Sequence, residues 1–123
     1  ILNGANLNSK GVKSSVQIPI IFGYWITSLF SLCSKNAKSS QEMLRLMVKE
    51  PNVSPDELEQ IAVPTLVIAG KQDMIKENHT KLIANSISNS ELVLIEGDHF
   101  IANKESTVFN ERIESFLCKH TEE

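Results

Sequence analysis

The spacing of apolar residues changes near the middle of the chain. In the first half they recur every three or four positions, as at Ile18, Phe22 and Trp25, and this spacing is typical of one face of an α-helix. The second half contains short continuous apolar runs at 64–70 and 92–95. Runs of this length indicate strands that are covered on both faces. The pattern therefore predicts a helical region followed by an α/β region.

Three helices are predicted in the first half. The apolar stripe predicts one over 18–33, and Ser39 with Glu42 forms a capping box that predicts a second, which ends before Pro51. A second capping box at 54–57, with proline at the first helical position, predicts a short third helix.

The second half alternates between strand and helix. We expect strands over 64–70 and 92–95, a helix over 77–88 between them, and a closing helix with Asn103 as its N-cap. This order is typical of a βαβ crossover in a parallel sheet, and residues 1–7 suggest the end of one more strand. The predicted fold class is α/β, a partial parallel sheet of about three strands with flanking helices. Residues 1–13 and 61–123 would form this core, and 14–60 a helical cap insertion.

Composition limits the classes of partner. The chain has 123 residues, enough for one domain with a real core, and a net charge of −3 with scattered Lys and Arg. We therefore expect neither nucleic acid nor a membrane as a partner. No His, Cys or Asp cluster has metal-ligand spacing, so we expect no metal and no cofactor.

Two further features bear on location. Cys33 and Cys118 each lie in an apolar stretch and form no CxxC motif, which predicts buried, reduced thiols in a cytoplasmic protein. Residues 16–33 carry no charge, but polar residues dilute their hydropathy. We interpret them as an amphipathic helix rather than a membrane span.

Candidate chemistry lies where the two predicted strands end. Asp73 follows Gly70 by three residues, and His99 follows the second strand. Because adjacent parallel strands lie roughly 4.8 Å apart and end at the same edge, these two side chains can meet. A carboxylate on Nδ1 would orient the imidazole and leave Nε2 as a general base. The alternative is a helix-capping Asp beside an exposed loop His. His79 and His120 are interpreted as exposed.

The two segments that carry these residues resemble a known family. "VPTLVIAGKQDMI" (63–75) and "SELVLIEGDHF" (90–100) resemble the C-terminal part of the α/β-hydrolase fold. The resemblance implies that Asp73 is the catalytic acid after the seventh strand and His99 the histidine after the eighth. The turn Gly97-Asp98-His99 matches the family pattern incompletely, because Asp98 stands where a small residue is common. Asp98 could compete for the imidazole.

The resemblance also implies what else the enzyme needs. Residues 1–7 would be the sixth strand and 14–60 the cap that follows it. No G-x-S-x-G nucleophile motif occurs in the sequence, and in this family that motif precedes the sixth strand. We therefore expect the C-terminal part of a hydrolase, inactive alone, with its Ser, Asp or Cys nucleophile upstream of Ile1.

The expected substrate is a small ester-like or other partly apolar molecule. Phe22, Trp25 and Phe100 are candidate substrate contacts, although Phe22 and Trp25 could instead pack the cap. The alternative function is a non-catalytic α/β module that binds a small molecule or a partner. We also expect this chain to self-associate through the sheet edge beside residues 1–7.

Overall fold

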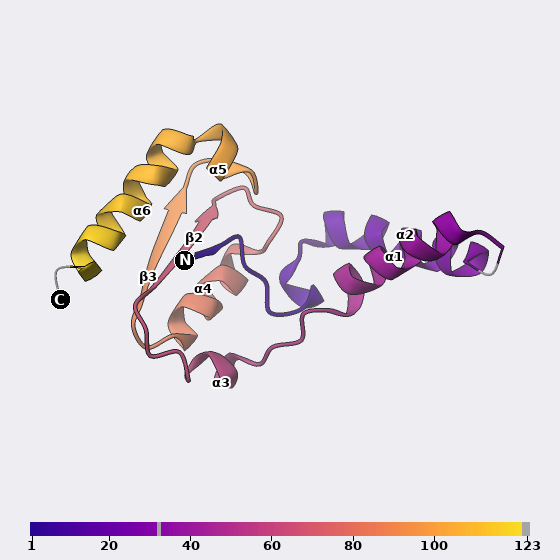
Figure 1. The fold of residues 1–123 in the computed structure, drawn as a ribbon, viewed down its shortest axis with the longest axis horizontal. Helices are drawn as coiled ribbons and strands as arrows, with labels where there is room; N and C mark the ends of the chain where they lie inside the picture. Colours follow the sequence, from indigo (N-terminus) through magenta and orange to yellow (C-terminus); the bar gives the residue numbers. More distant parts are fainter. Residues whose placement is uncertain (32, 122–123) are drawn as a thin grey trace. The chain divides into compact units, whose positions relative to one another are not determined.

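The computed structural model describes residues 1–31 and 33–121. The chain forms two compact units (Figure 1): a sheet unit, Ile1–Ala5 with Ser54–Glu123, and a helical unit, Asn6–Val53. Position 32, within the helix predicted over 18–33, lies outside the described residues. The assignment of 14–60 as a cap stays a prediction.

A parallel sheet organises the sheet unit. Its strands are β1 (Leu2–Asn3), β2 (Thr65–Gly70) and β3 (Ser90–Ile95), hydrogen-bonded in the order β1-β2-β3. Every residue of β2 is buried, as its continuous apolar sequence predicts for a strand covered on both faces. The predicted α/β class with a three-stranded parallel sheet is confirmed.

Helices cover both faces of this sheet (Figure 1). Helix α4 (Glu77–Ser86) connects β2 to β3, and α5 (Ile101–Lys104) leads into α6 (Ser106–Thr121). Leu66 and Ile68 of β2 form one core cluster with Phe109 and Phe116 of α6. Side chains alternate along a strand, so the residues between them face the side of α4. A short helix, α3 (Pro55–Leu58), precedes β2.

The helical unit is built mainly from two helices. A 3-10 turn, η1 (Ser9–Gly11), precedes α1 (Ser14–Phe30), and α2 (Lys35–Lys49) packs against α1. The amide Nε2 of Gln41 donates a hydrogen bond to the Ser28 hydroxyl at 3.0 Å, which links the two helices. In the described part of the chain, no helix combines the length and the apolar character that a bilayer crossing needs.

Of the three predicted helix N-caps, one is confirmed and two are wrong. The box at 54–57 is confirmed, because Glu57 Oε2 accepts a 2.7 Å hydrogen bond from the Ser54 amide. The box at Ser39 is wrong: α2 begins at Lys35, so Ser39 lies inside it. Asn103 is likewise inside α5 rather than at an N-cap. In both places the preceding residues also accept helical geometry, and the helix starts earlier.

The predicted exposure of four side chains needs correction. Cys33 and Cys118 are free thiols, as expected, but both are exposed rather than buried. His79 is buried, with 9% of its surface exposed, because the inner face of α4 begins one turn earlier than Ile83. His120 is partly covered, at 19% side-chain exposure, and its ring lies 4.6 Å from that of Phe116.

Candidate functional site

Asp73 lies in the turn that follows β2. Its amide donates to the Gly70 carbonyl at 3.1 Å, and its Oδ1 accepts a hydrogen bond from the Ile75 amide at 2.9 Å. The residue is 2% exposed. The backbone of its own turn therefore fixes the orientation of this carboxylate.

His99 comes to the same place from the end of β3. Its Nδ1 lies 2.9 Å from Asp73 Oδ1, the distance of a good hydrogen bond. The imidazole is one-third exposed, whereas the carboxylate is buried. An Nδ1–H donated to Asp73 leaves Nε2 to accept a proton from another group. The structure thus brings together the two residues that the sequence placed at adjacent strand ends.

Backbone contacts hold the two loops against each other. The Gln72 amide donates to the Gly97 carbonyl at 2.9 Å, and the Gly97 amide donates to Gln72 Oε1 at 3.1 Å. A Cβ on Gly70 would lie 2.3 Å from the Asp98 carbonyl oxygen. These contacts set the separation of the loops that carry Asp73 and His99.

Gly4 also touches the pair, and the sequence interpretation missed it. It follows β1 directly and has a φ of +55°. A Cβ at this position would lie 2.8 Å from His99 Cε1 and 3.3 Å from Asp73 Oδ2. In the sequence, Gly4 lies between Asn3 and Asn6 at the end of a predicted strand, and this composition indicates a turn. It does not indicate which side chains pack against that turn.

The second oxygen of the buried carboxylate is exceptional. Asp73 Oδ2 is a buried polar atom that has no hydrogen-bond partner in the described part of the chain. A buried acceptor without a donor costs about 1–3 kcal/mol. A buried polar atom left unpaired needs an explanation, and a catalytic role of the residue is one such explanation.

Asp98 is engaged away from the imidazole. Its Oδ1 accepts from the Phe100 amide at 2.9 Å, and Oδ2 pairs with Lys104. The Lys104 hydrogen bond, with help from the Phe100 amide, lowers the pKa of Asp98 below its ordinary value. The carboxylate is therefore anionic and points its oxygens at α5.

The candidate substrate contacts fall in different units. Phe100 lies in the sheet unit, 54% exposed, with its ring edge-on to His99 at 5.8 Å between centroids. Phe22 and Trp25 lie on α1 of the helical unit and are 66% and 69% exposed. Such exposure argues against the alternative that these two side chains pack the interior of that unit.

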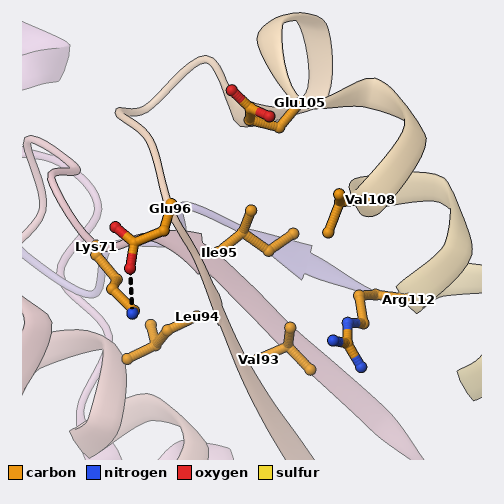
Figure 2. A pocket seen from close by; sticks show the side chains of 8 residues that line it. All are labelled: Lys71, Val93, Leu94, Ile95, Glu96, Glu105, Val108 and Arg112. Carbon is orange, nitrogen blue, oxygen red and sulfur yellow. Dashed lines mark hydrogen bonds and ion pairs between the residues drawn. The ribbon is translucent and has the colours of Figure 1, made fainter.

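A pocket of about 290 Å³ lies elsewhere in the sheet unit, along β3 and α6 (Figure 2). At its rim Lys71 pairs with Glu96, and this hydrogen bond raises the pKa of Lys71 and lowers that of Glu96. Because both groups are exposed, water screens the pair and it adds little stability. The lining residues are Lys71, Val93, Leu94, Ile95, Glu96, Glu105, Val108 and Arg112, and so exclude the Asp73–His99 pair.

Within ranges 1–31 and 33–121, no group of three or more His, Cys, Asp and Glu side chains is arranged to hold a metal ion.

Comparison with known proteins adds a family match. Residues 28–110 match the family model described as serine hydrolase (FSH1), a span of more than half of the chain. No curated protein sequence matches the chain significantly.

Solved structures with the same fold were also found. A bromoperoxidase from Bacillus anthracis is 24% identical with a TM-score of 0.56, and the match covers 80% of this chain and 44% of that one. A meta-cleavage product hydrolase from Pseudomonas fluorescens is 17% identical with a TM-score of 0.63, covering 95% of this chain and 54% of that one. The chain thus spans about half the length of these structures.

Proposed function

Because this chain belongs to the serine hydrolase (FSH1) family, we propose that Asp73 and His99 are the acid and the general base of a nucleophile–histidine–acid triad. The observation that carries the proposal is the 2.9 Å contact between His99 Nδ1 and Asp73 Oδ1. The burial of Asp73 supports it, because a carboxylate shielded from water interacts more strongly with a partner that becomes positively charged.

The proposed chemistry uses the two imidazole nitrogens for different tasks. Asp73 accepts a hydrogen bond from Nδ1–H and thereby favours the tautomer in which Nε2 carries no proton. Nε2 then takes the proton from a nucleophile hydroxyl as that oxygen attacks the substrate carbonyl, and later donates it to the leaving group. The Ile75 amide, which binds Asp73 Oδ1, keeps the carboxylate in place while the imidazolium forms.

We propose that the chain supplies these two residues to a longer hydrolase, whose serine lies in the G-x-S-x-G motif that is absent from this sequence. The substrate would be a small ester-like or other partly apolar molecule, with Phe100 as a contact beside His99. The chain by itself would be inactive, since the donors that stabilise an oxyanion are often the largest single contribution to the rate.

The test is a kinetic comparison in the longer enzyme with an activated ester. We expect Asp73→Asn to lower kcat by about 10⁴-fold, and His99→Ala to lower it by more, because the histidine itself transfers the proton. His120→Gln is the matched control, because His120 lies on α6 beside Phe116 and should leave kcat unchanged. Near-normal activity of His99→Ala would overturn the proposal.

A second measurement concerns the chain alone. The purified chain should not turn over the same ester above the rate of free imidazole. A turnover that disappears in His99→Ala would contradict the proposed division of the triad.

A further inference from the structure

We infer that Gly4 is a positioning residue that holds the His99 imidazole in hydrogen-bond contact with Asp73. The inference rests on the proposed function of the Asp73–His99 pair, and adds a third residue from a different strand. Gly4 comes from the end of β1, whereas the pair comes from the loops after β2 and β3.

The backbone of Gly4 is tied to the strand that carries the acid. Its amide donates a 3.0 Å hydrogen bond to the Ile68 carbonyl of β2, and Asn3 lies opposite Ile68 in the parallel register. A substituted residue at position 4 therefore cannot move away from the site without breaking the β1–β2 ladder.

The space beside the Gly4 α-carbon is filled by the pair itself. A Cβ would lie 2.8 Å from His99 Cε1 and 2.9 Å from His99 Nδ1, closer than carbon atoms pack in protein interiors. It would also lie 3.3 Å from Asp73 Oδ2. The hydrogen of glycine thus packs against the edge of the ring that carries the Nδ1–Asp73 contact.

Of the neighbours, the imidazole is the group that must move. Asp73 is held by the Ile75 amide and is almost fully buried, whereas the His99 side chain is one-third exposed. Any larger side chain at position 4 would push the ring outward, away from Asp73 Oδ1. The residue thus acts through the histidine and needs no contact with substrate.

The positive φ of Gly4 must be separated from this steric effect. A φ of +55° strains alanine, whereas asparagine tolerates the left-handed region better. Both residues carry a Cβ. If the Cβ displaces the imidazole, Gly4→Ala and Gly4→Asn lose the contact alike. If backbone strain is the cause, Gly4→Asn is the milder change.

The experiment is two-bond ¹H–¹⁵N NMR of the histidine rings in the chain as it is, at mildly alkaline pH. This measurement identifies which ring nitrogen carries the proton, and His79 and His120 serve as internal references. We expect the Nδ1–H form for His99, with a downfield Nδ1 proton, and loss of that signal in both Gly4 variants. Gly23→Ala is the matched control. Its added Cβ on α1 meets Leu44 at an ordinary 3.4 Å.

The outcomes separate this inference from the proposed function. Retention of the Nδ1–H signal in Gly4→Ala and Gly4→Asn would overturn the role of Gly4 and leave the Asp73–His99 pair intact. Loss of the Nδ1–H signal in Gly4→Ala but not in Gly4→Asn would show that backbone strain, and not the added Cβ, disrupts the contact. That result would also overturn the role of Gly4. Absence of the signal in the unsubstituted chain, with no change in Asp73→Asn, would instead refute the pair itself. Unchanged circular dichroism verifies that each variant is folded.

Discussion

Gly70 and Asp98 are in backbone contact: a Cβ on Gly70 would lie 2.3 Å from the Asp98 carbonyl oxygen. The contact joins the end of β2, which leads to Asp73, with the turn that leads to His99. A flexible side chain could yield to an added methyl group, but a carbonyl in a hydrogen-bonded loop cannot. The separation of the Asp73 and His99 side chains therefore depends on Gly70, which is neither of them.

Gly70→Ala should destabilise the sheet unit by about 1–3 kcal/mol or more, as overpacking of a rigid site does. It should also weaken the His99 Nδ1–H NMR signal, because the His99 loop must shift. Urea unfolding followed by circular dichroism measures the first effect. Trp25 and Tyr24 both belong to the helical unit, so fluorescence reports separately on that unit and should change little.

The control is Gly23→Ala, which replaces a glycine inside α1. Alanine is preferred to glycine in a helix interior by about 0.5–1 kcal/mol, so this variant should be neutral or more stable. A Gly70→Ala chain as stable as the unsubstituted one would show that the loops after β2 and β3 can separate freely.

Burial of His79 predicts a loss of stability in acid. Desolvation, with a smaller contribution from Lys76, lowers the pKa of His79 below the ordinary value of 6.5. In the pH range between the two values the unfolded chain binds more protons than the folded chain. The free energy of unfolding therefore falls as pH decreases from 6.5 toward the folded-state pKa.

His79→Gln should remove this part of the pH dependence, because glutamine does not titrate. The measurement is urea unfolding at about pH 8 and about pH 5, on either side of the ordinary range of imidazole protonation. An unchanged slope in His79→Gln would contradict the assignment.

Capping at Ser54 and at Ser39 can be compared directly. Ser54→Ala removes a side-chain acceptor at the N-cap of α3 and should cost about 0.5–2 kcal/mol. Ser39→Ala replaces an exposed serine inside α2, where alanine is the better helix former by about 0.5 kcal/mol. Thermal unfolding, followed by circular dichroism, measures the stability of both variants. Destabilisation by Ser39→Ala equal to that by Ser54→Ala would mean that α2 starts at Ser39 in solution.

Self-association through a sheet edge is a further prediction. The edge beside residues 1–7 stays a prediction, and the structure offers a second, longer edge: β1 has two residues, whereas β3, at the other side of the sheet, has six. The Ile95 carbonyl accepts from the Lys71 amide of the loop after β2. Since backbone groups alternate in direction along a strand, those of Leu92 and Leu94 point away from β2. We therefore expect a concentration-dependent dimer in sedimentation experiments.

Leu94→Pro tests this edge, because it removes an amide that points away from β2 and so leaves the β2–β3 ladder intact. It should shift the chain toward monomer. Val93→Pro, by the same alternation, removes an amide that faces β2 and should unfold the sheet unit. A monomer at all concentrations in the unsubstituted chain would count against self-association.

The sheet and the proximity of Asp73 to His99 were predictable, because short sequence patterns determine both. Continuous apolar runs such as 64–70 require cover on both faces, and short crossovers then make the strands parallel. Parallel strands end on one edge, which brings Asp73 toward His99. The 2.9 Å distance could not be read from spacing, but the contact could.

The errors have a common physical cause. Ser39 and Asn103 have the side chains of N-caps, but a cap is defined by where the helix begins, and Lys35 and Ile101 begin those helices earlier. His79 was assigned to the surface from its polarity, although its position relative to Ile83 puts it on the inner face of α4. Gly4 was missed because contacts across strands leave no local pattern. Tertiary neighbours decide each of these positions.

Acid and base are both delivered by one β–α–β segment, β2 to β3, within a single stretch of the chain. Under the proposed roles, changes elsewhere in the chain could alter which substrate is selected and leave the proton-transfer groups in place, provided that position 4 keeps its glycine.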